Sequence, residues 1–300
     1  MTIGIGDIPI LQRSSVRMRN PEDVFNKIDS IVSGKKETLQ IITDYDFTLT
    51  KQHVNGIGTL SSFGLLSLWD QLPEGFMNKD MAIKERYYPY EVDLNMTPEE
   101  KTPYMIEWYK ASENLWKGVQ FNLSALIKLI AEKGPELRDG TVELCRILEK
   151  NKIPLLVLSA GLGDVLTEVL KYHGLTENDH FHIISNFFKL NQDSVVEGYG
   201  VGESGCFIHP FNKSGLGCGS YFKKMSCKQN VILMGDSLGD AKMDQGVPDI
   251  NTVLKIGFLY GTERVIEKSL PSYLQCFDIV LVDDQSMDVL RAVIDLVVSQ

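Results

Sequence analysis

Two aspartates separated by a single residue follow an apolar run, and their types and spacing could support chemistry. In LQIITDYDFTLT, residues 39–50, the apolar run stops at Asp44, and Asp46 comes two positions later. Two carboxylates that close repel each other unless a cation or a reaction needs them there. The segment therefore predicts a buried strand over residues 39–43 that ends in an acidic functional site.

Two later apolar runs also end in polar residues. Residues 153–159 finish in Ser159, and residues 231–235 lead into Asp236 and Asp240 of GDSLGD. Ligands of open parallel sheets gather at the carboxyl ends of the strands, so we expect these side chains to join the first pair. Four carboxylates and a hydroxyl suit Mg²⁺, which prefers oxygen ligands, and they suit phosphoryl transfer. One carboxylate would attack phosphorus, and another would move a proton.

The elements that must position these residues alternate between strand and helix. Apolar runs predict the strands, and helical patterns with capping residues predict the segments between them. The expected strands cover residues 39–43, 153–159, 181–185, 231–235, 253–259 and 277–282, and the expected helices cover 20–33, 140–150, 163–173, 238–244, 262–270 and 286–298. Such alternation indicates an α/β fold, a Rossmann-like parallel sheet with helices on both faces.

Residues 51–135 have a different character, because helix signals dominate and no strong strand is expected there. Thr97 and Glu100 have the spacing of a capping box, which predicts a helix over about 98–117. Asn122 is placed to cap another helix after it.

Predicted strands lie both before and after this helical block. We therefore predict an inserted helical cap over 51–135 and an α/β core formed by residues 1–50 and 136–300. A helix in the middle of the cap is expected to be disturbed at Pro89, because proline removes a helix hydrogen bond.

Composition narrows the class of protein. The 300 residues are 43% hydrophobic and carry a net charge of −10, which argues against binding to nucleic acid polymers or anionic membranes. No apolar run approaches the length of a membrane span, and the N-terminus is a poor signal peptide. The five cysteines contain no CxxC pair, so we expect reduced thiols and a cytoplasmic protein. We also expect a monomer.

The motifs DYDFTLT, LSAG and GDSLGD resemble, in order and in strand-end placement, motifs of the haloacid dehalogenase superfamily. The resemblance implies a haloacid dehalogenase-like core and Mg²⁺ as cofactor. It implies that Asp44 is the nucleophile and forms an aspartyl-phosphate. It also implies that Asp46 protonates the leaving oxygen, then activates water, and binds the metal through its main-chain carbonyl.

The same resemblance gives roles to the other motifs. Ser159 and Ala160 would contact the transferred phosphoryl group, and Lys213, in FNK between the second and last motifs, would lie beside it. Asp236 would be a magnesium ligand. Asp240 would support the metal site from behind the direct ligands. A solvated loop lysine is the alternative interpretation of Lys213.

A narrower resemblance covers most of the chain from residue 14 onward. The segments that carry it are SSVRMRNP, LQIITDYDFTLT, ERYYPYEVD, EEKTPYMIEWY, LSAGLGDVL, FNK and ILMGDSLGD. They resemble the cytosolic pyrimidine 5'-nucleotidase family, which includes enzymes specific for 7-methylguanosine phosphate. The resemblance implies magnesium-dependent hydrolysis of a nucleoside 5'-monophosphate to nucleoside and phosphate.

Base recognition in that family falls to the cap, and the matching positions here are Glu91 and Ser112. Trp116 stands where the pyrimidine-preferring members carry a smaller aliphatic residue. A cationic 7-methylguanine stacked on an indole gains roughly 0.5–2 kcal/mol. We therefore predict stacking between Trp116 and Phe76, with Glu91 accepting from the base. Packing inside the cap is the alternative for both rings, and the other candidate aromatics are Phe63, Tyr87 and Tyr88.

The resulting expectation is hydrolysis of 7-methylguanosine 5'-monophosphate, with cytidine 5'-monophosphate as a second substrate. One alternative is a general pyrimidine 5'-nucleotidase or phosphotransferase for cytidine and uridine monophosphates. The other is a non-catalytic protein that binds cap nucleotides.

Overall fold

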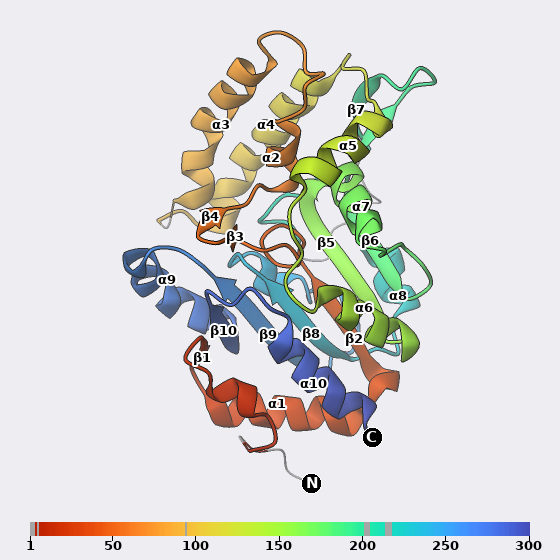
Figure 1. The fold of residues 1–300 in the computed structure, drawn as a ribbon. Helices are drawn as coiled ribbons and strands as arrows, with labels where there is room; N and C mark the ends of the chain where they lie inside the picture. The colour runs from red at the N-terminus through yellow and green to blue at the C-terminus, as the bar shows by residue number, and fades with distance from the viewer. Residues whose placement is uncertain (1–3, 5, 94, 201–204, 214–217) are drawn as a thin grey trace.

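The computed structural model describes residues 4, 6–93, 95–200, 205–213 and 218–300, and within them one eight-stranded sheet forms the centre of the molecule (Figure 1). Its order is β1-β10-β9-β8-β2-β5-β6-β7. Neighbours from β10 to β6 are parallel, and the two outer pairs are antiparallel. The strands are β1 Val16–Met18, β2 Leu39–Thr43, β5 Leu155–Leu162, β6 Phe181–Leu190, β7 Val196–Gly200, β8 Asn230–Gly235, β9 Thr252–Leu259 and β10 Ile279–Val282.

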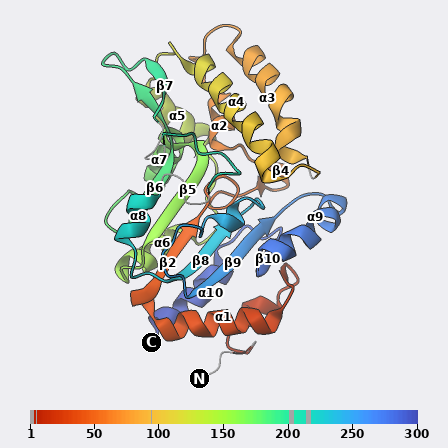
Figure 2. The same cartoon turned by 180° about the vertical axis from the view of Figure 1, so that it is seen from behind.

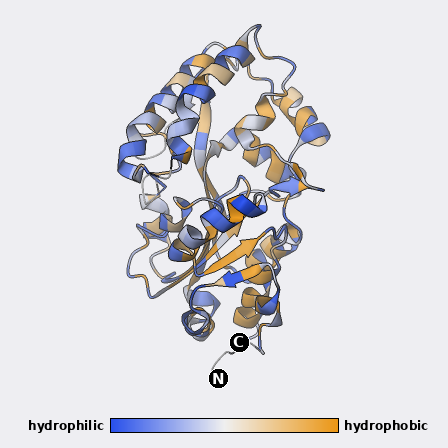
Figure 3. Ribbon diagram, turned by 90° about the vertical axis from the view of Figure 1, so that its left-hand side faces the viewer, coloured by the Kyte–Doolittle hydropathy of each residue, from blue (hydrophilic) through white to orange (hydrophobic). Residues whose placement is uncertain are grey.

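Helices cover both faces of the sheet, because its central strands are apolar on both sides. In β8, Ile232 packs with one buried cluster, whereas Val231 and Leu233 pack with the other. The first cluster includes residues of α1 Pro21–Gly34, α6 Thr141–Lys150, α7 Gly163–Tyr172 and α10 Asp288–Val298. The second includes residues of α8 Gly219–Lys224 and α9 Glu263–Cys276. Figure 3 shows the resulting hydrophobic strands at the centre. Parallel strands buried on both faces require such covering.

The segment between β2 and β5 is mostly helical. It contains a short hairpin, β3 His53–Val54 with β4 Ile57–Gly58, and then α2 Ser62–Leu66, α3 Phe76–Val92, α4 Pro98–Trp116 and α5 Leu123–Lys133. Figures 1 and 2 show α3 and α4 side by side, beyond the end of the sheet where β2 and β8 finish. Tyr90 and Tyr104 join these two helices by stacking at 3.8 Å. The division into a core and a cap with boundaries at 51 and 135 stays a prediction.

Local signals placed several elements correctly. Asn20 caps α1 by accepting from the N–H of Asp23, and the capping box of Thr97 and Glu100 is formed at the start of α4. The strand over 39–43 is confirmed residue for residue.

Other expectations were wrong in length or kind. Helix α3 continues through Pro89 to Val92, because tertiary packing overrides the local cost of a proline. Only a 3₁₀ turn, Asp240–Lys242, occupies the expected helix over 238–244. Strands β1 and β7 and helix α8 were not expected. Among the described helices, none combines the length and the apolar character needed to cross a membrane.

Candidate active site

The turn after β2 places two aspartates at the carboxyl end of the sheet. The N–H of Asp44 donates to the carbonyl of Met234 at 3.0 Å, so this residue continues the pairing of β2 with β8. Its side chain is 4% exposed. Asp46 points to a different partner, because its two carboxylate oxygens accept from the N–H and the hydroxyl of Ser62, both at 2.7 Å. The first residue of α2 thus fixes the second aspartate.

Lys213 lies between two of the carboxylates. Its Nζ is 2.5 Å from Oδ1 of Asp44 and 2.8 Å from Oδ1 of Asp240, and its side chain is 5% exposed. The other carboxylate oxygen of Asp240 accepts from the N–H and hydroxyl of Ser237. The structure therefore brings the sequence-predicted lysine to the predicted nucleophile, and Asp240 holds it there.

Three carboxylates form a cluster that could hold a metal ion. Oxygen atoms of Asp44, Asp236 and Asp240 lie within 4.8 Å of one another. Burial raises the pKa of Asp44 to about 7, although Lys213 opposes the shift, and burial together with Asp44 raises the pKa of Asp236. One lysine against three buried carboxylates leaves excess negative charge, and a hard divalent cation would offset it. The side chain of Asp46 lies outside this cluster, so its carboxylate stays available for proton transfer.

The end of β5 completes this edge of the site. Gly161 donates its N–H to Oγ of Ser159 at 3.0 Å, and Leu162 donates to the hydroxyl of Ser62 at 3.1 Å. A Cβ atom on Gly161 would lie 2.2 Å from the Ser62 hydroxyl and 2.7 Å from Oδ2 of Asp46. A glycine is required here because the backbone of β5 approaches the aspartate turn so closely. Ser159 is therefore next to the predicted acid.

Two residues that sequence reasoning missed connect this strand end to its surroundings. The hydroxyl of Tyr109, on α4, donates to the carbonyl of Ala160 at 2.7 Å. Asn186 donates to the same carbonyl at 3.0 Å and exchanges hydrogen bonds with both main-chain groups of Ile208. Ile208 begins the segment that leads to Lys213, so Asn186 connects the end of β5 to that segment. An asparagine inside a strand gives no sequence signal of this role.

Glu91 and Ser112, the two residues predicted to recognise the base, lie on α3 and α4. Burial raises the pKa of the Glu91 carboxyl, while Lys101 and Lys213 oppose the shift. The carboxylate of Glu91 accepts no hydrogen bond from the residues that the structure describes; Lys101 donates to the main-chain carbonyl instead. Ser112 forms a 3.0 Å hydrogen bond with the hydroxyl of Tyr199. Glu91 thus offers a free acceptor whose charge interacts with that of Lys213.

Phe76 and Trp116 adopt a geometry that differs from the expected sandwich. Their ring centroids are 4.7 Å apart with planes at 62°, an edge-to-face contact, so a base could lie between them only if the rings moved apart. The side chains are 4% and 3% exposed, and Trp116 also packs against Trp69 and Phe188. This arrangement favours the packing interpretation. Base stacking by these two rings stays a prediction.

Other aromatic rings lie nearer the reactive groups. Tyr109 approaches Phe63 at 6.3 Å and Phe207 at 6.0 Å between ring centroids. Burial and the charge of Glu91 raise the pKa of Tyr109, and Lys213 and Asp46 also influence it. These rings come from α2, α4 and the segment before Lys213, which are far apart in sequence. Sequence spacing alone could not bring them together.

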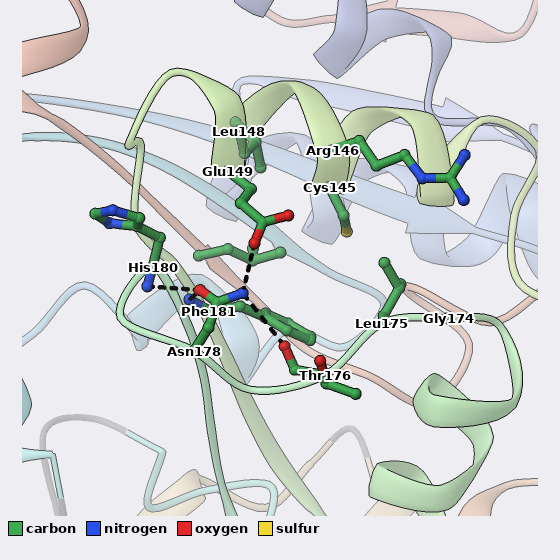
Figure 4. Close-up of a pocket in the computed structure, with 11 residues that line it drawn as sticks. Cys145, Arg146, Leu148, Glu149, Gly174, Leu175, Thr176, Asn178, His180 and Phe181 are labelled. Carbon is green, nitrogen blue, oxygen red and sulfur yellow. Dashed lines mark hydrogen bonds between the residues drawn. The ribbon is translucent and has the colours of Figure 1, made fainter.

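A separate hollow opens at the opposite end of the strands. Figure 4 shows that Asn178, His180 and Phe181 line it beside α6. Asn178 donates to Glu149 and to the carbonyl of Thr176, and it accepts from His180. None of the residues predicted for the site lines it. Because its polar groups bond to one another, this hollow is not the candidate site.

Comparisons with known proteins identify the family of the chain. Residues 47–298 match the family model described as Pyrimidine 5'-nucleotidase (UMPH-1). A 7-methylguanosine phosphate-specific 5'-nucleotidase of Drosophila melanogaster is 37% identical, with 98% of this chain and 91% of that protein covered. The Homo sapiens protein of the same name is 32% identical, with 98% and 96% covered.

The solved structures extend the comparison. Cytosolic 5'-nucleotidase IIIB bound to cytidine is similar with a TM-score of 0.92 and 36% identity, with 99% of this chain and 98% of that chain covered. A probable phosphoserine phosphatase from Vibrio cholerae, 11% identical with a TM-score of 0.52, covers 88% of this chain and shares the fold. The likeness to a haloacid dehalogenase-type core is thus confirmed. The chain belongs to the pyrimidine 5'-nucleotidase family and is an enzyme of the 5'-nucleotidase class.

Proposed function

We propose that this 5'-nucleotidase hydrolyses 7-methylguanosine 5'-monophosphate, with cytidine 5'-monophosphate as a second substrate, and that it requires Mg²⁺. The observation that carries the base preference is the free, partly buried carboxylate of Glu91 near Lys213. A carboxylate accepts from the N–H donors of guanine and complements the positive charge of its 7-methylated form. The names of the Drosophila and human relatives support the same substrate.

In the proposed reaction, an oxygen of Asp44 attacks phosphorus while the bond to the 5' oxygen of the nucleoside breaks. Asp46 donates its proton to that oxygen, and the nucleoside leaves. Burial raises the pKa of Asp46 to about 6, although the hydrogen bonds from Ser62 oppose the shift, and this value suits an acid near neutral pH. Asp46 then removes a proton from water, which attacks the aspartyl-phosphate and regenerates Asp44.

Other residues of the chain hold the phosphoryl group and its charge. Lys213 would donate to a phosphoryl oxygen, and Ser159 with the main chain at Ala160 would bind the remaining oxygens. Asp44, Asp236 and the main-chain carbonyl of Asp46 would hold Mg²⁺, which supplies positive charge against the phosphate when bound. Asp240 would keep Lys213 in place through their 2.8 Å contact.

Two pairs of rings are candidates for stacking on the base. The sequence favours Trp116 with Phe76, which must then separate when substrate binds. The geometry offers Tyr109 with Phe207, because the Tyr109 hydroxyl bonds to Ala160 at the end of β5 and the charge of Glu91 raises the pKa of Tyr109. Loss of selectivity in Trp116→Leu supports the first pair, and loss in Tyr109→Leu supports the second.

A second candidate, a pyrimidine 5'-nucleotidase or phosphotransferase, is favoured by the cytidine bound to the solved relative. A non-catalytic protein that binds cap nucleotides would have no use for the Lys213–Asp44 pair. For the cellular setting we propose a cytosolic monomer that acts on free nucleotides, because the charge of −10 disfavours nucleic acid polymers.

The test is phosphate release from 7-methylguanosine, cytidine, uridine and guanosine monophosphates, in Mg²⁺ and in chelator, with Asp44→Asn as the inactive control. We expect the highest kcat/KM for the methylated purine and no turnover in chelator. A tenfold preference for the pyrimidines, about 1.4 kcal/mol in transition-state binding, would overturn the substrate assignment. Glu91→Gln should lower the methylated-purine activity selectively, whereas Glu85→Gln, an exposed change on the same helix, should not.

A further inference from the structure

Arg138 is a buried cation to which neither the sequence motifs nor the proposed reaction gives a role. It lies where the chain returns from the helical segment to the sheet, and it is 1% exposed, among the largest fully buried side chains. No carboxylate of the described residues forms an ion pair with it. A buried, unpaired guanidinium is costly unless its donors are used, so their acceptors identify its role.

The donors of Arg138 bind the turn that carries the two site aspartates. Its Nη2 donates to the carbonyl of Phe47 at 2.7 Å, and its Nε donates to the carbonyl of Thr48 at 2.7 Å. Its main-chain N–H donates to the carbonyl of Leu49 at 2.9 Å. One residue therefore holds three consecutive carbonyl groups directly after Asp46. Such a forked contact needs the planar geometry of arginine, which lysine lacks.

The held turn needs support because its backbone is strained. Phe47 follows Asp46 with a φ of 61°, in the left-handed region that bulky residues avoid. A bulky residue in such a conformation is strained and persists only where its surroundings fix it. The N–H of Phe47 bonds to the hydroxyl of Thr50, and Arg138 binds its carbonyl. Both main-chain groups of the strained residue are therefore held.

The other contacts of Arg138 anchor it to the sheet. Its Nη1 donates to the carbonyl of Asp284, after β10, and its guanidinium lies 3.8 Å from the ring centre of Phe258 on β9. Burial lowers its pKa to about 10, while Asp236 opposes the shift, so the group stays charged at neutral pH. The arginine thus links the rigid sheet to the turn.

The junction of the helical segment with the sheet does not depend on this side chain. Main-chain hydrogen bonds pair residues 49–51 with residues 136–138 there. Arg138 donates to Leu49, Lys51 donates to Glu136, and Thr50 forms a bridge with Leu137. These bonds survive a substitution at Arg138. The substitution removes the side-chain hydrogen bonds to the carbonyls of Phe47 and Thr48.

We propose that Arg138 is a positioning residue for the hydrolysis, which fixes the turn after Asp44 and Asp46 in its reactive geometry through the carbonyls of Phe47 and Thr48. The proposal rests on the proposed function, because it assumes that these aspartates react. Because Arg138 does not contact the substrate in this proposal, substrate binding should depend only weakly on Arg138.

The test compares Arg138→Lys, which keeps the charge but not the fork, with Arg138→Met, which loses both. Displacement of reacting groups by about 1 Å costs up to roughly 100-fold, so we expect kcat to fall about 10- to 100-fold in both variants. KM should stay within about threefold. Guanidinium at millimolar concentration should restore part of kcat in Arg138→Met without changing its unfolding temperature.

Val231→Ala is the matched control, because this buried residue of β8 packs in the other cluster from Tyr45 and Leu49 of the turn and should cost stability without lowering kcat. Unchanged kcat in a folded Arg138→Lys, or a rise in KM alone, would overturn the proposal. Failure of both variants to fold would also overturn it, since Arg138 would then be a folding residue. An inactive wild-type protein would instead refute the proposed function.

Discussion

Replacing Asp44 by asparagine should stabilise the metal-free protein while abolishing its activity. Three carboxylate groups lie within 4.8 Å of one another, and among the described residues Lys213 is the one cation that forms ion pairs with them. Burial raises the pKa of Asp44 from 3.8 to about 7 against the opposing charge of Lys213. A folded-state pKa above the unfolded value means that folding becomes less favourable as pH rises towards 7.

The size of the effect follows from that difference in pKa. A shift of about 3 units corresponds to roughly 4 kcal/mol of unfolding free energy lost above pH 7, and to about 1–2 kcal/mol lost at pH 5. Asparagine carries no such charge at either pH. The stabilisation by Asp44→Asn should therefore be about 2–3 kcal/mol larger at pH 8 than at pH 5.

Urea unfolding in chelator at the two pH values measures this difference directly. Asp244→Asn is the control, because it removes a partly buried aspartate that pairs with Lys255 at 2.9 Å and is not one of the three clustered carboxylates. It should destabilise the protein by up to about 1 kcal/mol at both pH values. Destabilisation by Asp44→Asn at both pH values would refute the account of repulsion within the cluster.

Three further predictions follow from the same geometry. Mg²⁺ at 100 times its dissociation constant should add about 2.7 kcal/mol to the unfolding free energy near pH 8. At pH 5 it should add much less, because protons compete for the carboxylates. Equal stabilisation at both pH values would mean that the ion binds elsewhere. Trp116→Leu should lower the unfolding free energy by roughly 2–4 kcal/mol and leave the substrate ratio unchanged, because the ring is packed. A selective loss of activity on the methylated purine in kinetic assays would instead support the stacking role. Glu91→Gln should reduce kcat/KM for 7-methylguanosine monophosphate about tenfold more than for cytidine monophosphate, and equal reductions would exclude recognition of the base charge.

The reactive edge of the sheet was predictable because its signals are local. Asp44, Ser159 and Asp236 each end an apolar run, and parallel strands bring such ends together. Helix caps were predictable for the same reason, as Asn20 shows. The lysine followed only from the resemblance to a known superfamily, since no spacing rule singles out Lys213.

The parts of the candidate site that the sequence did not predict depend on contacts between distant segments. Arg138 and Asn186 act through main-chain carbonyls far away in the sequence, and neither belongs to a recognisable motif. The rings around Tyr109 meet only after the helices pack. For Trp116 the sequence does not separate the two roles, because an indole that stacks on a ligand and one that fills a core have the same local pattern.

The most direct test of the central claim is a rapid quench of the enzyme with 7-methylguanosine 5'-monophosphate labelled in its phosphate, followed by mapping of the label. The Asp46→Asn variant in Mg²⁺ should slow breakdown of the intermediate and let it accumulate. We expect labelled phosphate on Asp44 and no label in Asp44→Asn. Phosphate release at the full rate with no label on Asp44, or label on another residue, would contradict it.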